Sequence, residues 1–255
     1  MGVAALFLEN RLIFQPRREM VDTPADHGMR YEDVWVRTSD GLTIHGWFLP
    51  SEGPTKAWLL FSHGSQGNMS GHPVSARPLV QHGYAVLNYD YRGFGRSEGA
   101  PSEEGTYRDG EAMLAELVRR APGPGHVFLY GRSLGGAVSH ELAVHHPELG
   151  GLITDCSFTD MPSMVRALVA IPGIGRLFRT RYDNLDKARR TKLPRLVLHG
   201  TDDEVVPLSM AIALRDATSP PADHHWVQGA HHNDTFEHED YFEAMGRFVE
   251  RHLPR

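Results

Sequence analysis

The segment Gly131-Arg132-Ser133-Leu134-Gly135 stands between an apolar run, Val127–Tyr130, and a helical pattern that begins at Leu134. The spacing alone is a weak signal, since about 0.1 chance matches are expected in a chain of this length. Between a strand and a helix, it predicts a tight turn whose glycines let neighbouring backbone approach closely. Such a turn raises a serine hydroxyl above the edge of a sheet, with the first amides of the helix beneath it. We therefore expect Ser133 to be a nucleophile.

Outward from this segment, short apolar runs alternate with helical patterns. The predicted strands lie at residues 57–61, 85–89, 126–130, 151–154, 195–199 and 224–227, and the predicted helices near 71–82, 103–120, 134–146, 208–217 and 236–252. The later strands are almost continuously apolar, which is typical of a parallel sheet covered on both faces. Two further runs, 34–36 and 42–47, flank Ser39-Asp40-Gly41 and indicate an antiparallel hairpin. This order predicts a doubly wound sheet in a single α/β domain.

Residues 157–193 interrupt the alternation and are too long for an ordinary connection. We expect them to form a cap of two short helices, broken at Pro172-Gly173, whose apolar side chains contact a substrate. These side chains are Met161, Met164, Leu168, Val169, Ile171, Ile174, Leu177 and Phe178.

Residues 1–16 are expected to form an N-terminal helix that docks on the body of the protein. Their longest apolar run, Val3–Leu8, is far shorter than the ~20 residues that cross a bilayer. Because no basic segment or small-residue cleavage site accompanies this run, we do not expect a signal peptide. Weak contact with a membrane or a lipid substrate is the alternative role of the segment. We expect a cytoplasmic protein, peripheral to a membrane at most.

Composition excludes several classes of protein. The 255 residues contain 40% hydrophobic and 23% charged residues, which is ordinary for a globular chain and unlike collagen, coiled coils or disordered proteins. The formal net charge of −6 argues against a nucleic-acid partner. A single cysteine, Cys156, rules out an intrachain disulfide and a thiolate metal cluster. The pairs His224-His225 and His231-His232 suggest a metal-dependent hydrolase, but no His-Glu-x-x-His helix appears. We therefore expect no metal and no cofactor.

A serine nucleophile needs a histidine base and an acid that orients the histidine. The base is expected on the loop after the last strand, where either His231 or His232 could point inward. The acid is expected on the turn after the preceding strand, at Asp203, with Asp202 and Asp155 as rivals. The chain order of serine, acid and histidine is the one expected for this architecture.

The loop Phe61–Asn68 follows the first central strand and is the place for an amide that stabilises a developing oxyanion. We assign this role to the Ser65 and Leu134 amides, and we expect His63 to brace the loop.

Read together, five stretches resemble the α/β-hydrolase superfamily, and more narrowly its Bem46-like serine hydrolases, relatives of the protein depalmitoylases and monoacylglycerol lipases. These stretches are Phe61–Asn68, Asp90–Gly99, Gly131–Gly136, His199–Pro207 and Gly229–Asp234. The resemblance implies a mostly parallel eight-stranded sheet with helices on both faces and a short helical cap, in one domain over residues 1–255. It also implies that the Asp90–Gly99 motif orders a loop beside the site.

The resemblance places the nucleophile on Ser133, the acid on Asp203 and the base on His232. The chain departs from the family pattern at Ser65-Gln66, where relatives often have Asn-Ala, and at His231, where they often have Gly. The leading hypothesis is a serine hydrolase that cleaves small-molecule carboxylic esters or thioesters through an acyl-enzyme. A serine peptidase or an acyltransferase is the alternative, since the same triad serves both, and a non-catalytic binding protein is a weaker one.

Overall fold

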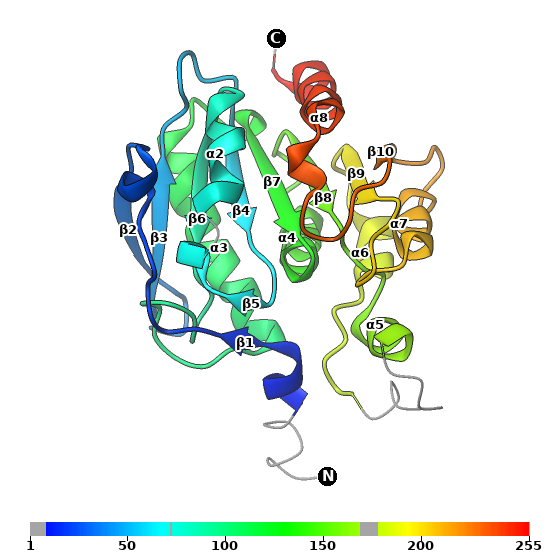
Figure 1. Cartoon of the computed structure of the whole chain (residues 1–255), viewed down its shortest axis with the longest axis horizontal. Coiled ribbons are helices and arrows are strands. Elements are labelled where there is room, and N and C mark those ends of the chain that lie inside the picture. The colour runs from blue at the N-terminus through cyan, green and yellow to red at the C-terminus, as the bar shows by residue number, and fades with distance from the viewer. Residues whose placement is uncertain (1–8, 72, 169–177, 255) are drawn as a thin grey trace.

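Figure 1 shows the computed structural model of the chain, which describes residues 9–71, 73–168 and 178–254. Its centre is an eight-stranded sheet with the spatial order β10-β9-β8-β7-β4-β6-β3-β2. The strands are β2 Glu32–Arg37, β3 Thr43–Leu49, β4 Ala57–Ser62, β6 Tyr84–Tyr89, β7 Val127–Arg132, β8 Gly151–Asp155, β9 Arg195–Gly200 and β10 Asp223–Val227. Only β3 runs against the other strands of this sheet, and it forms the expected hairpin with β2. The predicted mostly parallel sheet is thus confirmed.

Helices cover both faces of the sheet (Figure 1). The α-helices are α2 Pro73–Gln81, α3 Glu103–Arg120, α4 Leu134–His145, α5 Met161–Leu168, α6 Asn184–Arg190, α7 Leu208–Arg215 and α8 Glu239–His252. Short 3-10 helices lie at η1 Pro24–His27, η2 Met69–Gly71, η3 Pro124–His126 and η5 Thr235–Glu237. Helices α2 and α8 pack on one face, and α3, α4, α6 and α7 pack on the other.

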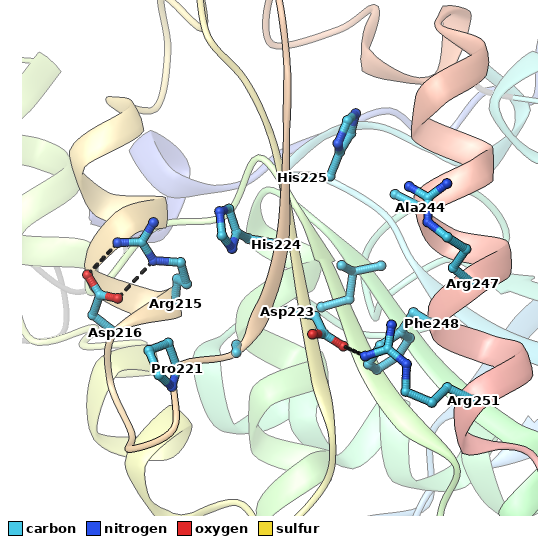
Figure 2. A pocket seen from close by; sticks show the side chains of 12 residues that line it. Arg215, Asp216, Pro221, Asp223, His224, His225, Ala244, Arg247, Phe248 and Arg251 are labelled. Carbon is cyan, nitrogen blue, oxygen red and sulfur yellow. Dashed lines mark hydrogen bonds and ion pairs between the residues drawn. The ribbon is translucent and has the colours of Figure 1, made fainter.

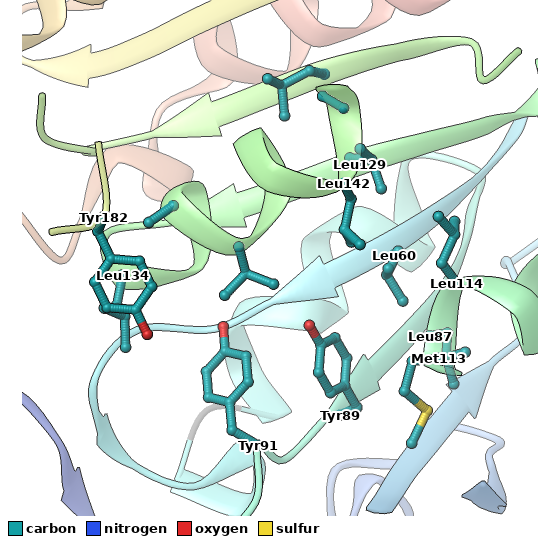
Figure 3. Packing of buried hydrophobic residues seen from close by; sticks show 14 of the residues in the cluster. Leu60, Leu87, Tyr89, Tyr91, Met113, Leu114, Leu129, Leu134, Leu142 and Tyr182 are labelled. Carbon is teal, nitrogen blue, oxygen red and sulfur yellow. The ribbon is translucent and has the colours of Figure 1, made fainter. Parts of the chain in front are cut away.

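The alternation of side chains along each strand supplies a separate core for each face. In β7, Val127 and Leu129 belong to the cluster beneath α3 and α4, whereas Phe128 and Tyr130 belong to the cluster beneath α8. Figure 3 shows the first of these clusters, in which Leu129 of β7 lies near Leu142 of α4. Each fully buried leucine contributes about 1.5–3 kcal/mol. These two cores hold the carboxyl ends of the parallel strands at one edge, where the site lies.

The N-terminal segment departs from its expected structure. The expected helix over residues 1–16 is wrong at its end, because only residues 9–13 of its described part are helical. Gln15–Pro16 instead form β1, which pairs in parallel with β5, Gln66–Gly67. The physical reason is Pro16, since a residue that precedes proline is driven towards extended backbone. Residues 1–8 lie outside the described residues.

The insertion over residues 157–193 also differs in part from the expected cap. Helix α5 lies beneath the sheet edge in Figure 1, but α6 packs against α4 and belongs to the layer that covers the sheet. The reason is topological, since α6 occupies the crossover between the parallel strands β8 and β9. The described part of the cap is therefore α5 and residues 178–183. The boundaries of the single domain and of its insertion stay a prediction. None of the described helices is long and apolar enough to cross a membrane.

Candidate active site

The turn between β7 and α4 holds Ser133 in a strained conformation, with φ 51° and ψ −116°. Positive φ is uncommon outside glycine, and such strain is found at functional sites. The flanking glycines make the turn possible. A Cβ on Gly135 would lie 1.8 Å from the carbonyl oxygen of Ser62, and one on Gly131 would lie 2.4 Å from that of Gly135. The turn is also fixed by the Ser133 amide, which donates to the carbonyl of Asp155 at 2.9 Å.

His232 and Asp203 form a buried pair beside this turn. The Nδ1 of His232 lies 2.8 Å from Oδ2 of Asp203, which accepts the hydrogen bond. The other oxygen, Oδ1, accepts from the amides of Val205 and Val206 at 2.9 and 2.8 Å. Burial by itself raises the pKa of Asp203, but the hydrogen bonds from His232 and these amides hold the pKa below its ordinary value. Asp203 is therefore an ionised acceptor that fixes the orientation of the imidazole.

The rival residues lie elsewhere. His231 is exposed, with Nδ1 3.2 Å from the Glu204 carboxylate. Asp202 is exposed and accepts from the hydroxyl of Thr201. Asp155 is buried, but its carboxylate accepts from Thr235 and pairs with an arginine. Of the two histidines left open by the sequence pattern, His232 is the one that bonds to the acid.

Ser133 and His232 line the same cavity, of about 270 Å³. Within the described residues no hydrogen bond joins the serine hydroxyl to the imidazole. Ser65 also lines this cavity. The described backbone offers no acceptor to the amides of Ser65 and Leu134, and for Leu134 this follows from its place at the start of α4.

A second, apolar cavity of about 290 Å³ meets the first one at Ser133, Ser65 and Val205. Its lining includes Leu12, Ile13, Met161, Met164, Leu168 and Phe178. The cap side chains expected to contact a substrate therefore line the same cavity as Ser133, as far as they are described. Val169, Ile171, Ile174 and Leu177 lie outside the described residues.

Comparisons with known proteins show the family of the chain. A family model described as Serine aminopeptidase, S33, matches residues 53–185. Alpha/beta hydrolase domain-containing protein 17B of Xenopus tropicalis is 33% identical over 227 residues, which are 87% of this chain and 76% of that protein. Protein bem46 of Schizosaccharomyces pombe is 33% identical over 248 residues, 92% of this chain and 82% of its own. The chain belongs to the α/β-hydrolase superfamily.

Solved structures give the same fold. An esterase of Pyrococcus furiosus, Pf2001, has a TM-score of 0.77 at 19% identity, covering 95% of this chain and 98% of its own. An alpha-beta hydrolase from Vibrio vulnificus has a TM-score of 0.76 at 19% identity, covering 98% and 93%. The family model and the two relatives confirm the resemblance to the Bem46-like α/β hydrolases, and the chain is a hydrolase.

In this α/β hydrolase, the loop that carries Ser65 is braced from beneath by a buried pair. The Nε2 of His63 lies 3.3 Å from Oδ1 of Asp90, which also accepts from the amide of Met69 at 2.7 Å. The hydroxyl of Tyr91 donates to the carbonyl of His63 at 2.7 Å. The Asp90–Gly99 motif thus orders the loop beside the site, as the sequence predicts.

Two carboxylates that the sequence analysis did not single out hold the described part of the cap. Glu9 accepts hydrogen bonds from the first two amides of residues 179–182, and Glu103 accepts from the last two, at 2.6–2.9 Å. Phe178, which directly precedes these residues, lines the apolar cavity together with Leu12. Because both carboxylates bind backbone, no side-chain pattern in the partner segment indicates the contact.

Other features of the hydrolase lie apart from this chemistry. A cavity of about 510 Å³ beside β10, between α7 and α8, shares no lining residue with the two at Ser133 (Figure 2). Four of its charged groups form two ion pairs, Arg215 with Asp216 and Arg251 with Asp223. The thiol of Cys156 lies within 4.8 Å of ligand atoms of Asp203 and His232. Burial raises the pKa of this thiol well above its ordinary value.

Proposed function

We propose that this hydrolase cleaves carboxylic esters or thioesters through an acyl-enzyme on Ser133. The observation that carries the proposal is the position of Ser133 where two cavities meet. One cavity contains His232, which is bonded to Asp203, and the other is apolar. This arrangement provides a proton acceptor on one side of the serine and space for an acyl chain on the other.

In the proposed mechanism, the Ser133 oxygen attacks the substrate carbonyl carbon while the Nε2 of His232 takes the hydroxyl proton. Asp203 stabilises the imidazolium through Nδ1. The negative charge that develops on the carbonyl oxygen is stabilised by the amides of Ser65 and Leu134 and by the N-terminal end of α4. The imidazolium then donates its proton to the departing alcohol or thiol, and the bond from the carbonyl carbon to that group breaks.

A water molecule completes the reaction. His232 takes a proton from the water as its oxygen attacks the acyl carbon, and Ser133 departs with a proton returned by the imidazolium. Among the described residues, no hydrogen bond joins the Ser133 hydroxyl to His232. Such bonds are often long before a substrate arrives, and they tighten in the complex.

The apolar cavity favours an ester or thioester with an aliphatic acyl group over a peptide. Its described lining from α5 and the N-terminal helix carries no charged side chain. Two leucines of this lining, Leu12 and Leu168, are 62% and 58% exposed. Exposed apolar side chains beside an acyl pocket suit weak contact with a lipid surface, which we propose as the role of this edge of the molecule.

The test is hydrolysis of matched acyl esters, acyl thioesters and aminoacyl amides by the wild type and by site variants. We expect Ser133→Ala to lower kcat by at least about 10³-fold and to abolish fluorophosphonate labelling. Asp203→Asn should lower kcat by a similar factor, whereas the matched control Asp202→Asn should be within about twofold of the wild type. A preference for aminoacyl amides would replace the esterase with a peptidase. Full activity of Ser133→Ala would refute the acyl-enzyme.

A further inference from the structure

Arg132 precedes the serine and extends towards the loop that carries His232. It is the last residue of β7 and lies opposite Asp155, the last residue of β8, in the parallel register. Its side chain is only 9% exposed. One terminal nitrogen of the guanidinium donates to the main-chain carbonyl of His232 and lies 3.2 Å from Oδ1 of Asn233. A residue adjacent to the serine thus binds the backbone of the histidine.

The same loop is held at two further points. The guanidinium carbon of Arg132 lies 5.1 Å from the centre of the Phe236 ring. The Nε of Arg132 lies 3.4 Å from Oδ2 of Asp155. Both oxygens of that carboxylate accept from the hydroxyl of Thr235 at 3.1 Å. Arg132 and Asp155 together therefore contact the loop at residues 232, 233, 235 and 236.

Asp155 also holds the serine side of the site through its carbonyl, which accepts from the Ser133 amide at 2.9 Å. The Arg132–Asp155 pair therefore connects the main chain at Ser133 with the main chain at His232, the two residues that must exchange a proton. A buried arginine needs an opposite charge, and Asp155 supplies it. Burial by itself would lower the pKa of Arg132, but Asp155 raises it, so the guanidinium stays charged. The planar fork binds the loop and the carboxylate at once, which a lysine cannot do equally well.

We propose that Arg132 is a positioning residue that fixes the His232 loop relative to Ser133. The proposal rests on the proposed function, because it assigns Arg132 an effect only through His232. Arg132 takes no part in bond making. It sets the distance across which the serine proton is transferred, and a shift of about 1 Å in such a distance can cost about 100-fold in rate.

The first experiment compares Arg132→Met with Arg132→Lys on a good ester substrate. We expect Arg132→Met to lower kcat by about 10- to 100-fold with KM within about threefold of wild type, because the apolar cavity is untouched. Arg132→Lys keeps the charge but only one point of contact, so its kcat should lie between those of the wild type and Arg132→Met. Should Arg132→Met fail to fold, the double variant Arg132→Met, Asp155→Asn removes both buried charges and should show the same loss of kcat.

The matched control is Arg195→Met. Arg195 is also buried and also donates to a main-chain carbonyl, that of Leu214, at 2.8 Å. It lies at the start of β9, outside the cavities at Ser133. Its loss should lower the urea midpoint of unfolding and leave kcat within about twofold of wild type.

The second experiment repeats Arg132→Met in a His232→Ala background. If Arg132 acts through His232, the substitution costs less than about threefold there, because the group that it positions is already gone. An equal loss in both backgrounds would overturn the positioning role, as would wild-type kcat in Arg132→Met. Failure of the proposed function is a separate result, because His232→Ala alone would then keep wild-type activity.

Discussion

Gly135 is the residue at which fold and site are most tightly connected. A Cβ placed there would lie 1.8 Å from the carbonyl oxygen of Ser62 in β4, and backbone cannot give way as a flexible side chain can. We predict that Gly135→Ala lowers the free energy of unfolding by about 3 kcal/mol or more and abolishes ester hydrolysis. Urea unfolding and an ester assay would measure both effects.

Gly246 in α8 is the control for this prediction, since no atom lies within 4 Å of a Cβ built on it. Gly246→Ala should stabilise the protein by about 0.5–1 kcal/mol through helix propensity alone. Gly135 also lies in a helix, so helix propensity by itself would raise the free energy of unfolding in both substitutions. A stable, active Gly135→Ala would show that the turn does not need close approach of the two backbones.

At the residue scale, the sequence predicted the kind of side chains in the site better than their orientation. His231 and His232 are adjacent, and the pattern along the chain leaves both in place as the base. The choice depends on contacts with distant residues, because Glu204 binds one ring and Asp203 the other. Arg132 was overlooked because its partners lie on a loop a hundred residues later, and no local pattern marks them.

In the proposed function, substrate selection depends on helix α5. Met164 is buried and lines the apolar cavity. We predict that Met164→Trp fills part of this space and lowers kcat/KM for palmitoyl and decanoyl esters at least tenfold, while the acetyl ester stays within about threefold. A series of p-nitrophenyl esters from acetate to palmitate would measure the profile.

Ala167→Trp supplies the control, because Ala167 is exposed on the same helix and does not line the cavity. Its acyl-chain profile should match the wild type. If Met164→Trp left the profile unchanged, the acyl chain would not occupy this cavity.

Elements that begin or end because of neighbouring residues in the sequence were predicted well. Elements that depend on contacts with distant residues were not. Helix α3 begins at Glu103 as expected, because the Ser102 side chain accepts from the Gly105 amide. The pairing of β1 with β5 was missed because each strand has two residues and no alternating pattern. The hydrogen bonds from the cap to Glu9 could not be predicted, because their donors are main-chain amides, which every residue except proline carries.

For the molecule as a whole, His146 links three parts of the fold through its charge. It follows α4 at the C-terminal end, where a cation is favourable, and its side chain is 28% exposed. The hydrogen bond with Glu111 of α3, followed by the one with Glu148, raises its pKa from 6.5 to about 9. Since the pKa is higher in the folded protein, this contribution is fully present below about pH 6.5 and is lost as the pH rises towards 9.

We predict that His146→Gln lowers the free energy of unfolding by about 1–2 kcal/mol at pH 6 and by much less at pH 9.5. Urea unfolding of both proteins across this range would measure the difference. Glu111→Gln should reproduce most of the effect by removing the principal partner. A difference between wild type and His146→Gln that is constant with pH would contradict the linkage.

The mostly parallel central sheet was predictable because the apolar runs marked the central strands, and strand–helix alternation with crossovers leaves few topologies. The layout of the cap was less predictable, since α6 lies within the expected cap insertion but packs on α4. Burial across the whole molecule, rather than local pattern, decides that assignment.

The meeting of two cavities at one serine has a consequence for the fate of the acylated intermediate. Once the first product departs, the acyl chain stays in the apolar cavity. The cavity that contains His232 can then accept any small molecule with a hydroxyl group. Methanol or glycerol added to the medium then competes with water, and transesterified product accumulates in proportion to its concentration. If the acyl-enzyme divides between water and the added alcohol in this way, and total turnover is unchanged or faster, the first product leaves and the next reactant enters through the same cavity.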